Sequence, residues 1–173
     1  MNIEEGMIAP NFTVTDSQGT LKTLHEINGR KIVYFFPMAY GEESVKQAKS
    51  FQDSYDRLRE LDITEVIGIS VDDQQKLNEF KLECGLDYIL ISDITKKISK
   101  SYGVYRNRII VKYATRTTFI IGSNNVIEKI YSNEFLNEEN EIFIETYANN
   151  IEKELGVSVL NERLGTKLNN FAN

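Results

Sequence analysis

The chain has 173 residues, of which 41% are hydrophobic and 27% charged, and its formal net charge is −6. This length and composition are typical of one globular domain with its own core. The negative charge disfavours nucleic acid and anionic membrane surfaces as partners. No apolar run approaches the ~20 residues of a membrane span, and acidic residues stand where a signal peptide carries basic ones. A single Cys excludes an internal disulfide, so we expect a cytoplasmic protein.

The first predicted elements are an N-terminal hairpin, a buried strand and a helix. Residues 12–14 and 21–24 flank a polar turn and predict the hairpin. Residues 32–36 (IVYFF) form a continuous apolar run, as expected of a strand buried on both faces. Apolar residues at spacings of three and four then predict one amphipathic helix from about Glu43 to Leu58.

Strands and helices alternate through the rest of the predicted domain. We expect strands at 66–71, 88–92, 117–121 and 126–131, and helices from Asp72 or Asp73 to Gly85, at 94–102 and at 138–155. The basic segment 105–112 is predicted to be irregular. This order fits a thioredoxin-like α/β sandwich over residues 1–155. The polar tail 156–173 is expected to be a surface helix, a partner contact or disordered.

Motifs along the first 155 residues resemble, in order, those of one protein family. They are G-x-x-A-P-x-F at 6–12, Y-F-F-P at 34–37, F-x-D at 51–53, G-I-S-V-D at 68–72, L-I-S-D with Y-G-V at 90–93 and 102–104, and R-T-T-F-I-I at 116–121. The chain resembles the peroxiredoxins (alkyl hydroperoxide reductase/thiol-specific antioxidant class), most closely the bacterioferritin-comigratory or Q-type subfamily. The resemblance implies a thioredoxin-like sandwich of peroxiredoxin type with an N-terminal β-hairpin. It also implies thiol-dependent reduction of hydrogen peroxide or organic hydroperoxides by an external thiol reductant.

The segment after Pro37 is where this resemblance implies an active site. In the family the strand ends in P-x-x-x-(T/S)-x-x-C, and the Cys attacks the peroxide. Counted from Pro37, the Thr/Ser position falls on Gly41 and the Cys position on Ser44. By resemblance, Pro37 shields the site, and Arg116 together with the helix N-terminus activates the thiolate. The position where some Q-type members keep a resolving Cys falls on Lys49.

Ser44 predicts that the family reaction is absent or severely impaired. A hydroxyl is a much weaker acid than a thiol, and the single histidine, His25, lies in the N-terminal segment, without a clear route to the site. An engineered Cys→Ser change and a natural loss both leave a Ser here. Natural loss is favoured because Gly41 and Glu42 also depart from the family's Thr and Pro.

Other interpretations of these residues stay open. Ser44 is equally explained as a Ser that satisfies a free amide of the helix, and Arg116 as an ordinary ion-paired Arg. Cys84 is either a small packed hydrophobe or a substitute nucleophile at a helix C-terminus. The basic segment 105–113 either attracts an anion or is a solvated loop. The rival function is a non-catalytic thioredoxin-fold binding module with a protein partner, and we expect a monomer or a homodimer. The sequence predicts no cofactor, and a lone His and a lone Cys predict no metal site.

Overall fold

A five-stranded mixed sheet forms the centre of the computed structural model, which describes residues 3–15, 20–107, 112–132 and 151–156. Its strands, in spatial order, are β5 (Ile89–Ser92), β4 (Ile63–Ser70), β3 (Arg30–Phe35), β8 (Thr117–Ile121) and β9 (Ile127–Ser132). Strands β3, β4 and β5 are parallel, whereas β8 runs antiparallel to both β3 and β9. This order confirms the predicted thioredoxin-like arrangement.

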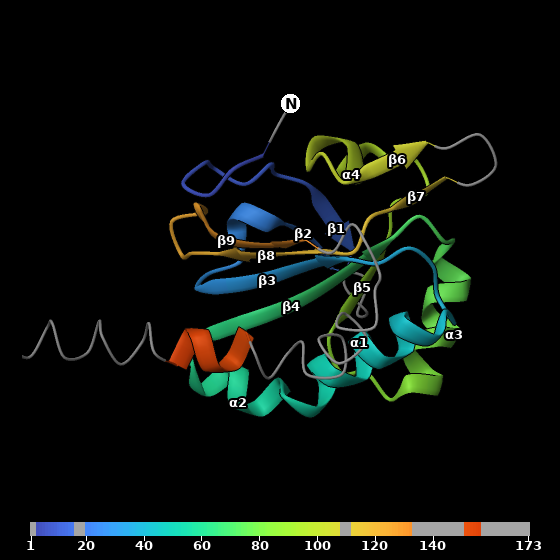
Figure 1. The fold of residues 1–173 in the computed structure, drawn as a ribbon, viewed down its shortest axis with the longest axis horizontal. Coiled ribbons are helices and arrows are strands. Elements are labelled where there is room, and N and C mark those ends of the chain that lie inside the picture. Colours follow the sequence, from blue (N-terminus) through green and yellow to red (C-terminus); the bar gives the residue numbers. More distant parts are fainter. Residues whose placement is uncertain (1–2, 16–19, 108–111, 133–150, 157–173) are drawn as a thin grey trace, which may run out of the picture.

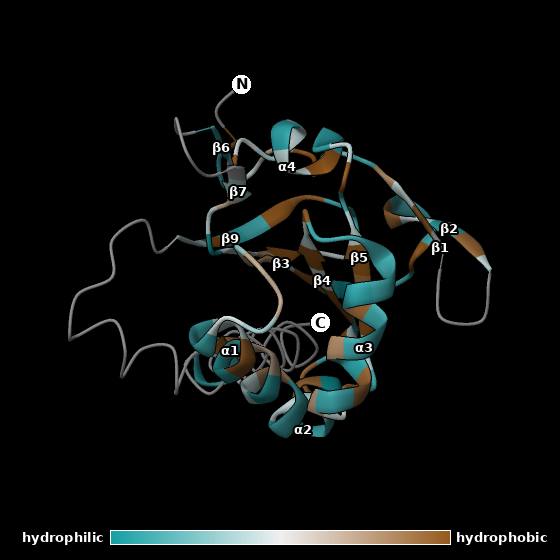
Figure 2. Cartoon of the chain, turned by 90° about the vertical axis from the view of Figure 1, so that its right-hand side faces the viewer, coloured by the Kyte–Doolittle hydropathy of each residue, from teal (hydrophilic) through white to brown (hydrophobic). Residues whose placement is uncertain are grey.

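Helices and small strands cover the two faces of this sheet (Figure 1). One face carries α1 (Glu42–Asp53), α2 (Tyr55–Glu60), α3 (Gln74–Cys84) and the helical residues 151–156. The other face carries β1 (Thr13–Thr15), β2 (Leu21–Thr23), the 3-10 helix η1 (Leu24–Glu26) and α4 (Lys97–Ser101). Figure 2 shows the central strands as mainly hydrophobic and the outer surfaces of the helices as mainly hydrophilic.

The core is divided by the sheet into two hydrophobic clusters. Along β3, Ile32 and Tyr34 join the cluster under α1, whereas Val33 and Phe35 join the cluster on the opposite face. Successive side chains of a strand point to opposite faces, so a strand buried on both sides has to be apolar throughout. The uninterrupted run in the sequence predicted this strand correctly.

A chain of hydroxyl groups fixes α1 against the sheet. The hydroxyl of Tyr88 donates to the carbonyl of Ala48 on α1 over 2.9 Å and lies 2.8 Å from the hydroxyl of Tyr34 on β3. Gly68 on β4 leaves the room that Tyr34 needs, because a Cβ there would lie 2.6 Å from the Tyr34 hydroxyl oxygen. Both tyrosines are fully buried, so this contact positions α1 precisely on its strands.

The structure differs from the predicted elements at a helix break and at two short strands. The expected single helix from Glu43 to Leu58 is interrupted at Ser54, which caps the end of α1 and the start of α2. The Ser54 hydroxyl accepts a hydrogen bond from the Arg57 side chain over 3.1 Å at this break. The segment 105–112, predicted to be irregular, holds the strand β6 (Tyr105–Asn107) and the first residue of its partner β7 (Lys112–Ala114); each strand is too short to show alternation in the sequence.

Other predicted elements are present where the structure describes them, but two have different bounds: the strand predicted at 66–71 is β4, which begins at Ile63, and the helix predicted at 94–102 is the shorter α4. Strands β1 and β2 pair antiparallel, as the hairpin prediction required. Asp73 is the N-cap of α3 and accepts from the Lys76 amide over 2.9 Å, and Gly85 ends this helix with φ of 63°. Of the helix predicted at 138–155, only residues from 151 onward lie within the described part, and the tail 157–173 lies outside it. Within the described residues no helix is long and apolar enough to cross a membrane.

Candidate active site

Ser44 lies in the first turn of α1, directly after the loop that follows β3. The backbone leaves β3 at Phe35, and Gly41 precedes the helix in an extended conformation with φ of −66° and ψ of 139°. Ser44 is buried, with 3% of its surface exposed. The N-cap of α1 is Gly41, which has no side chain to cap the helix, so the interpretation of Ser44 as a residue that satisfies a helix amide stays a prediction. The structure thus places Ser44 where a helix N-terminus favours negative charge.

Arg116 meets the same helix one turn further along. It directly precedes β8, is 6% exposed, and its Nη1 donates a hydrogen bond to Oε1 of Gln47. Gln47 is fully buried and stands three positions after Ser44, so both share one face of α1. The structure therefore brings Arg116 beside the turn that carries Ser44. Sequence reasoning missed Gln47, although a polar residue inside the apolar stripe of this helix was the signal that could have found it.

Two buried polar atoms near this contact have no hydrogen-bond partner in the described part of the chain. They are Nε2 of Gln47 and Oγ1 of Thr118. Thr118 lies on the same face of β8 as Arg116, because alternate residues of a strand share a face. Buried polar atoms are nearly always paired in folded proteins, so an orphaned donor and an orphaned hydroxyl need an explanation. A small polar ligand or water beside Arg116 would supply one.

Asp72 holds the loop between β3 and α1. Its Oδ2 accepts from the amide of Ala39 and from the hydroxyl of Ser70, each over 2.7 Å, and its Oδ1 lies 2.6 Å from Nζ of Lys76. Burial alone would raise the pKa of Asp72, but the hydrogen bonds from Lys76, Ser70 and Ala39 outweigh it and lower the pKa. The sequence predicted Asp72 or Asp73 as the cap of the next helix; Asp73 is the cap, and Asp72 holds the loop instead.

The outer part of the loop is fixed by Tyr40. Tyr40 has φ of 64°, a left-handed conformation that is unusual for a residue with a side chain. Its ring meets Phe80 of α3 edge to face at 5.4 Å, and its hydroxyl donates to Glu83 over 3.2 Å. Pro37 is half-buried at the start of the loop. The loop is therefore tied to the sheet at Ala39 and to α3 at Tyr40.

Nothing in the backbone requires a glycine at position 41. Its φ is negative, and a Cβ built there would lie 3.5 Å from both Cγ of Met38 and Oγ of Ser44, which are ordinary contact distances. A hydroxyl-bearing residue would therefore fit at Gly41, beside Ser44.

The first turn of α1 also carries negative charge. Glu42 and Glu43 occupy its first two positions, where acids stabilise the helix. The same carboxylates disfavour a second negative charge at the Ser44 position. Charge at this helix end therefore opposes the formation of a reactive anion.

The alternative nucleophile and the lone histidine are placed elsewhere. Cys84 ends α3, half-buried, and packs against the hydrophobic cluster under the helices. Burial raises the pKa of its thiol, which makes the thiolate scarce. His25 lies in η1, on the opposite face of the sheet, with Nε2 2.8 Å from the carbonyl oxygen of Ala9. Among the described residues, no group of three or more His, Cys, Asp or Glu side chains could hold a metal ion.

These features define a class of protein. A parallel β3–β4 pair delivers its carboxyl ends to one edge of the sheet, where a loop and a helix N-terminus meet a buried Arg. Open α/β sheets bind ligands at this edge. The chain is thus a thioredoxin-like protein with a polar site at the N-terminus of its first long helix.

Comparison with known proteins agrees with this class. The sequence model described as the AhpC/TSA family matches residues 6–130. "Putative peroxiredoxin Q, chloroplastic" of Oryza sativa subsp. indica is 36% identical over 138 residues, which are 79% of this chain and 63% of that protein. "Peroxiredoxin Q, chloroplastic" of Arabidopsis thaliana is 34% identical over 138 residues, with the same coverage of 79% and 63%.

Solved structures share the fold. The crystal structure of peroxidoxin BcpB from Mycobacterium tuberculosis has a TM-score of 0.77 and 24% identity, over 90% of this chain and 98% of that one. A Cys-to-Ser mutant of PrxQ from Xylella fastidiosa has a TM-score of 0.77 and 21% identity, over 91% and 98% of the two chains. The chain therefore belongs to the AhpC/TSA family, as a peroxiredoxin of the Q type. It spans 63% of the length of the plant relatives named above.

Proposed function

We propose that this chain carries the site of a thiol peroxidase, and that Ser44 leaves the reaction absent or severely impaired. The family reaction is thiol-dependent reduction of hydrogen peroxide or organic hydroperoxides. The observation that carries the proposal is the buried contact between Arg116 and Gln47, one turn beyond Ser44 on α1.

The reaction needs a thiolate at position 44. Its sulfur attacks one peroxide oxygen, the O–O bond breaks, and the departing oxygen takes a proton and leaves as water or an alcohol. The sulfur is oxidised to a sulfenic acid, which an external thiol then reduces. In this chain the α1 N-terminus and Arg116 would stabilise the thiolate and the developing negative charge on the departing oxygen.

Ser44 cannot replace that sulfur. Its hydroxyl is too weakly acidic to ionise here, and Glu42 and Glu43 oppose an anion at this helix end. The only histidine, which could have served as a base, lies on the opposite face of the sheet. A serine oxygen also gives no product equivalent to a reducible sulfenic acid.

We infer that the thiol was lost naturally rather than by design. Gly41 and Glu42 depart from the family pattern together with Ser44, whereas an engineered isostere would change one position only. Since a side chain at Gly41 has room, the absence of a hydroxyl there is a change of chemistry that the fold does not require.

The test is the rate at which a Ser44→Cys variant consumes hydrogen peroxide in the presence of a dithiol. The background carries Cys84→Ser, so that only one thiol is present. Ser50→Cys, the same change later on the same helix, is the matched control. We expect fast consumption by the Ser44→Cys variant, a rate typical of a free thiol for the control, and none from the Cys84→Ser background alone.

Two outcomes would overturn parts of this proposal. Brisk thiol-dependent turnover by the parent chain would contradict the inference about Ser44. A Ser44→Cys variant no faster than its Ser50→Cys control would mean that the site has lost its tuning. A non-catalytic binding module with a protein partner would then be the better interpretation. The cytoplasmic location and the oligomeric state stay predictions.

A further inference from the structure

Met38 is a sulfur-containing side chain that lies beside Ser44. It belongs to the loop between β3 and α1 and is 47% exposed. A Cβ built at Gly41 would lie 3.5 Å from Cγ of Met38 and also 3.5 Å from Oγ of Ser44, so the two side chains flank one point. The backbone next to Met38 is fixed, because the amide of Ala39 donates to Asp72 over 2.7 Å. The fold therefore holds a thioether at the mouth of the site.

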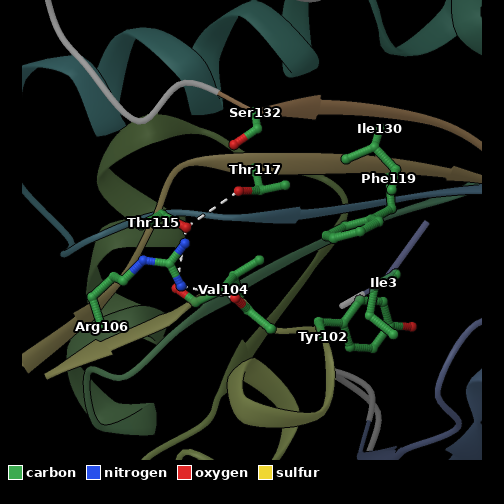
Figure 3. A pocket seen from close by; sticks show the side chains of 10 residues that line it. Ile3, Tyr102, Val104, Arg106, Thr115, Thr117, Phe119, Ile130 and Ser132 are labelled. Atoms are coloured by element: carbon green, nitrogen blue, oxygen red, sulfur yellow. Dashed lines mark hydrogen bonds between the residues drawn. The ribbon is translucent and has the colours of Figure 1, made fainter. Parts of the chain in front are cut away.

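Two buried polar atoms point to a small ligand on this side of the sheet. Nε2 of Gln47 and Oγ1 of Thr118 have no hydrogen-bond partner in the described residues, and both side chains are fully buried. Thr118 faces α1 because side chains alternate along β8, where Thr117 and Phe119 line a cavity of about 180 Å³ on the opposite face (Figure 3). Since buried polar atoms are nearly always paired, the two unpaired atoms indicate that a small polar molecule binds between α1 and β8.

The charges around this point suit a neutral nucleophile. Arg116 bonds Gln47 one turn beyond Ser44, and together with the N-terminus of α1 it stabilises negative charge on an oxygen that leaves a peroxide. Glu42 and Glu43 oppose an anionic nucleophile at the same helix end. A thioether has no proton to lose before it reacts, so these carboxylates do not hinder it.

We propose that Met38 is a site of oxidation by hydrogen peroxide bound beside Ser44. A lone pair of the thioether sulfur attacks one peroxide oxygen and forms the sulfur–oxygen bond, while the O–O bond breaks. The departing oxygen takes the proton of the transferred oxygen and leaves as water. The sulfur is thereby oxidised to a sulfoxide and the peroxide is reduced. This inference rests on the proposed peroxide site, but it needs no thiol.

The test uses the parent full chain, incubated with hydrogen peroxide and sampled over time for peptide mass spectrometry. Met7 is an internal control, because it is 38% exposed and lies on the N-terminal segment, where its carbonyl accepts from the amide of Ile127 over 2.8 Å. We expect the Met38 sulfoxide to form about tenfold faster than that of Met7, less than the ~100-fold effect of a positioned donor in an enclosed site, because Met38 is half exposed. In urea the two rates are expected to be equal.

Thr118→Val tests the contact with the bound peroxide. The change removes a hydroxyl that makes no hydrogen bond in the described part of the chain, so the fold is expected to tolerate it. We expect the oxidation of Met38 to slow severalfold, toward the rate of Met7. Thr13→Val, at an exposed position of β1, is the matched control and is expected to leave both rates unchanged.

Equal rates for Met38 and Met7 in the folded parent chain would overturn the inference, as would an unchanged Met38 rate in Thr118→Val. The comparison within the parent chain decides the case if that variant does not fold. Fast peroxide consumption by Ser44→Cys together with equal methionine rates would overturn this inference alone and leave the proposed function standing. Selective oxidation of Met38 beside a slow Ser44→Cys variant would support the inference and contradict the tuning of the site for a thiolate.

Discussion

Nη1 of Arg116 donates a hydrogen bond to Oε1 of Gln47, which joins the start of β8 to the second turn of α1 inside the core. The bond orients the guanidinium and leaves the Nε2 donor of Gln47 without a partner in the described residues. The side chain of Gln47 therefore links the charge of Arg116 to the helix that carries Ser44.

Gln47→Met in the Ser44→Cys background is expected to slow peroxide consumption and to raise the pKa of the introduced thiol. The change removes an acceptor from a buried cation, so it is also expected to lower the free energy of unfolding by about 1–3 kcal/mol. Gln47→Glu keeps an acceptor for Arg116 but adds a negative charge beside position 44, so it is expected to recover part of the lost stability without restoring the rate. Gln75→Met on the exposed side of α3 is the control. Equal rates for Gln47→Met and the control would show that the contact does not position Arg116.

Gly41→Thr in the Ser44→Cys background is expected to raise the peroxide rate severalfold. The new Cβ fits at 3.5 Å from the Ser44 oxygen position, and the hydroxyl could bond the peroxide. The stability change is expected to be small, because Thr and Gly are nearly equivalent at an N-cap. Gly41→Val has almost the same shape without the hydroxyl, so equal rates for the two variants would contradict a role for the hydroxyl.

Asp72→Asn is expected to destabilise the chain, because Asp72 accepts from Ala39 and Ser70 and pairs with Lys76. The pKa of Asp72 is lower in the folded chain than its ordinary value of about 3.9. The ionised carboxylate therefore stabilises the fold fully at pH values above about 3.9, and this stability is lost as pH falls through the lowered pKa. Urea unfolding should show a large difference between variant and parent at pH 7 and a small one near pH 3. Asp73→Asn keeps a good N-cap and is the control; a pH-independent difference for Asp72→Asn would refute the linkage.

Lys31→Met tests a buried amine at the other end of β3. Lys31 is fully buried and its Nζ donates to the carbonyl of Ile27 and to Oδ1 of Asn125, each over 2.8 Å. Burial lowers the pKa of Lys31. The unfolded chain therefore binds more protons than the folded one between the lowered pKa and about 10.4, so stability rises with pH across that window. The melting temperature of Lys31→Met should lose this rise, and Lys129→Met, on an exposed part of β9, should keep it.

Much of the fold was predictable from local patterns, and the failures have physical causes. The apolar run at 32–36 and Gly85 at the end of α3 were predicted correctly because each depends on neighbouring residues only. The break at Ser54 was missed because the apolar stripe continues through it, while a side-chain contact with Arg57 accompanies the turn. Strands β6 and β7 were missed because three residues carry too little alternation to detect.

The candidate site was predictable only in part for a similar reason. Ser44 and Gly41 were assigned by resemblance to the family motif that begins at Pro37, which is possible because they lie on one continuous segment. The contacts of Gln47 with Arg116 and of Asp72 with Ala39 join residues far apart in the chain. Residue spacing along the chain does not predict such long-range contacts, because only the folded sheet brings the two residues of each pair together.

Strand β8 presents different chemistry on its two sides, with Arg116 and Thr118 turned toward α1 and Thr117 and Phe119 toward the opposite cavity. Substitutions at positions 116 and 118 therefore affect the α1 side of the sheet, whereas substitutions at 117 and 119 affect the opposite side. The two faces can thus be changed independently although they share one backbone.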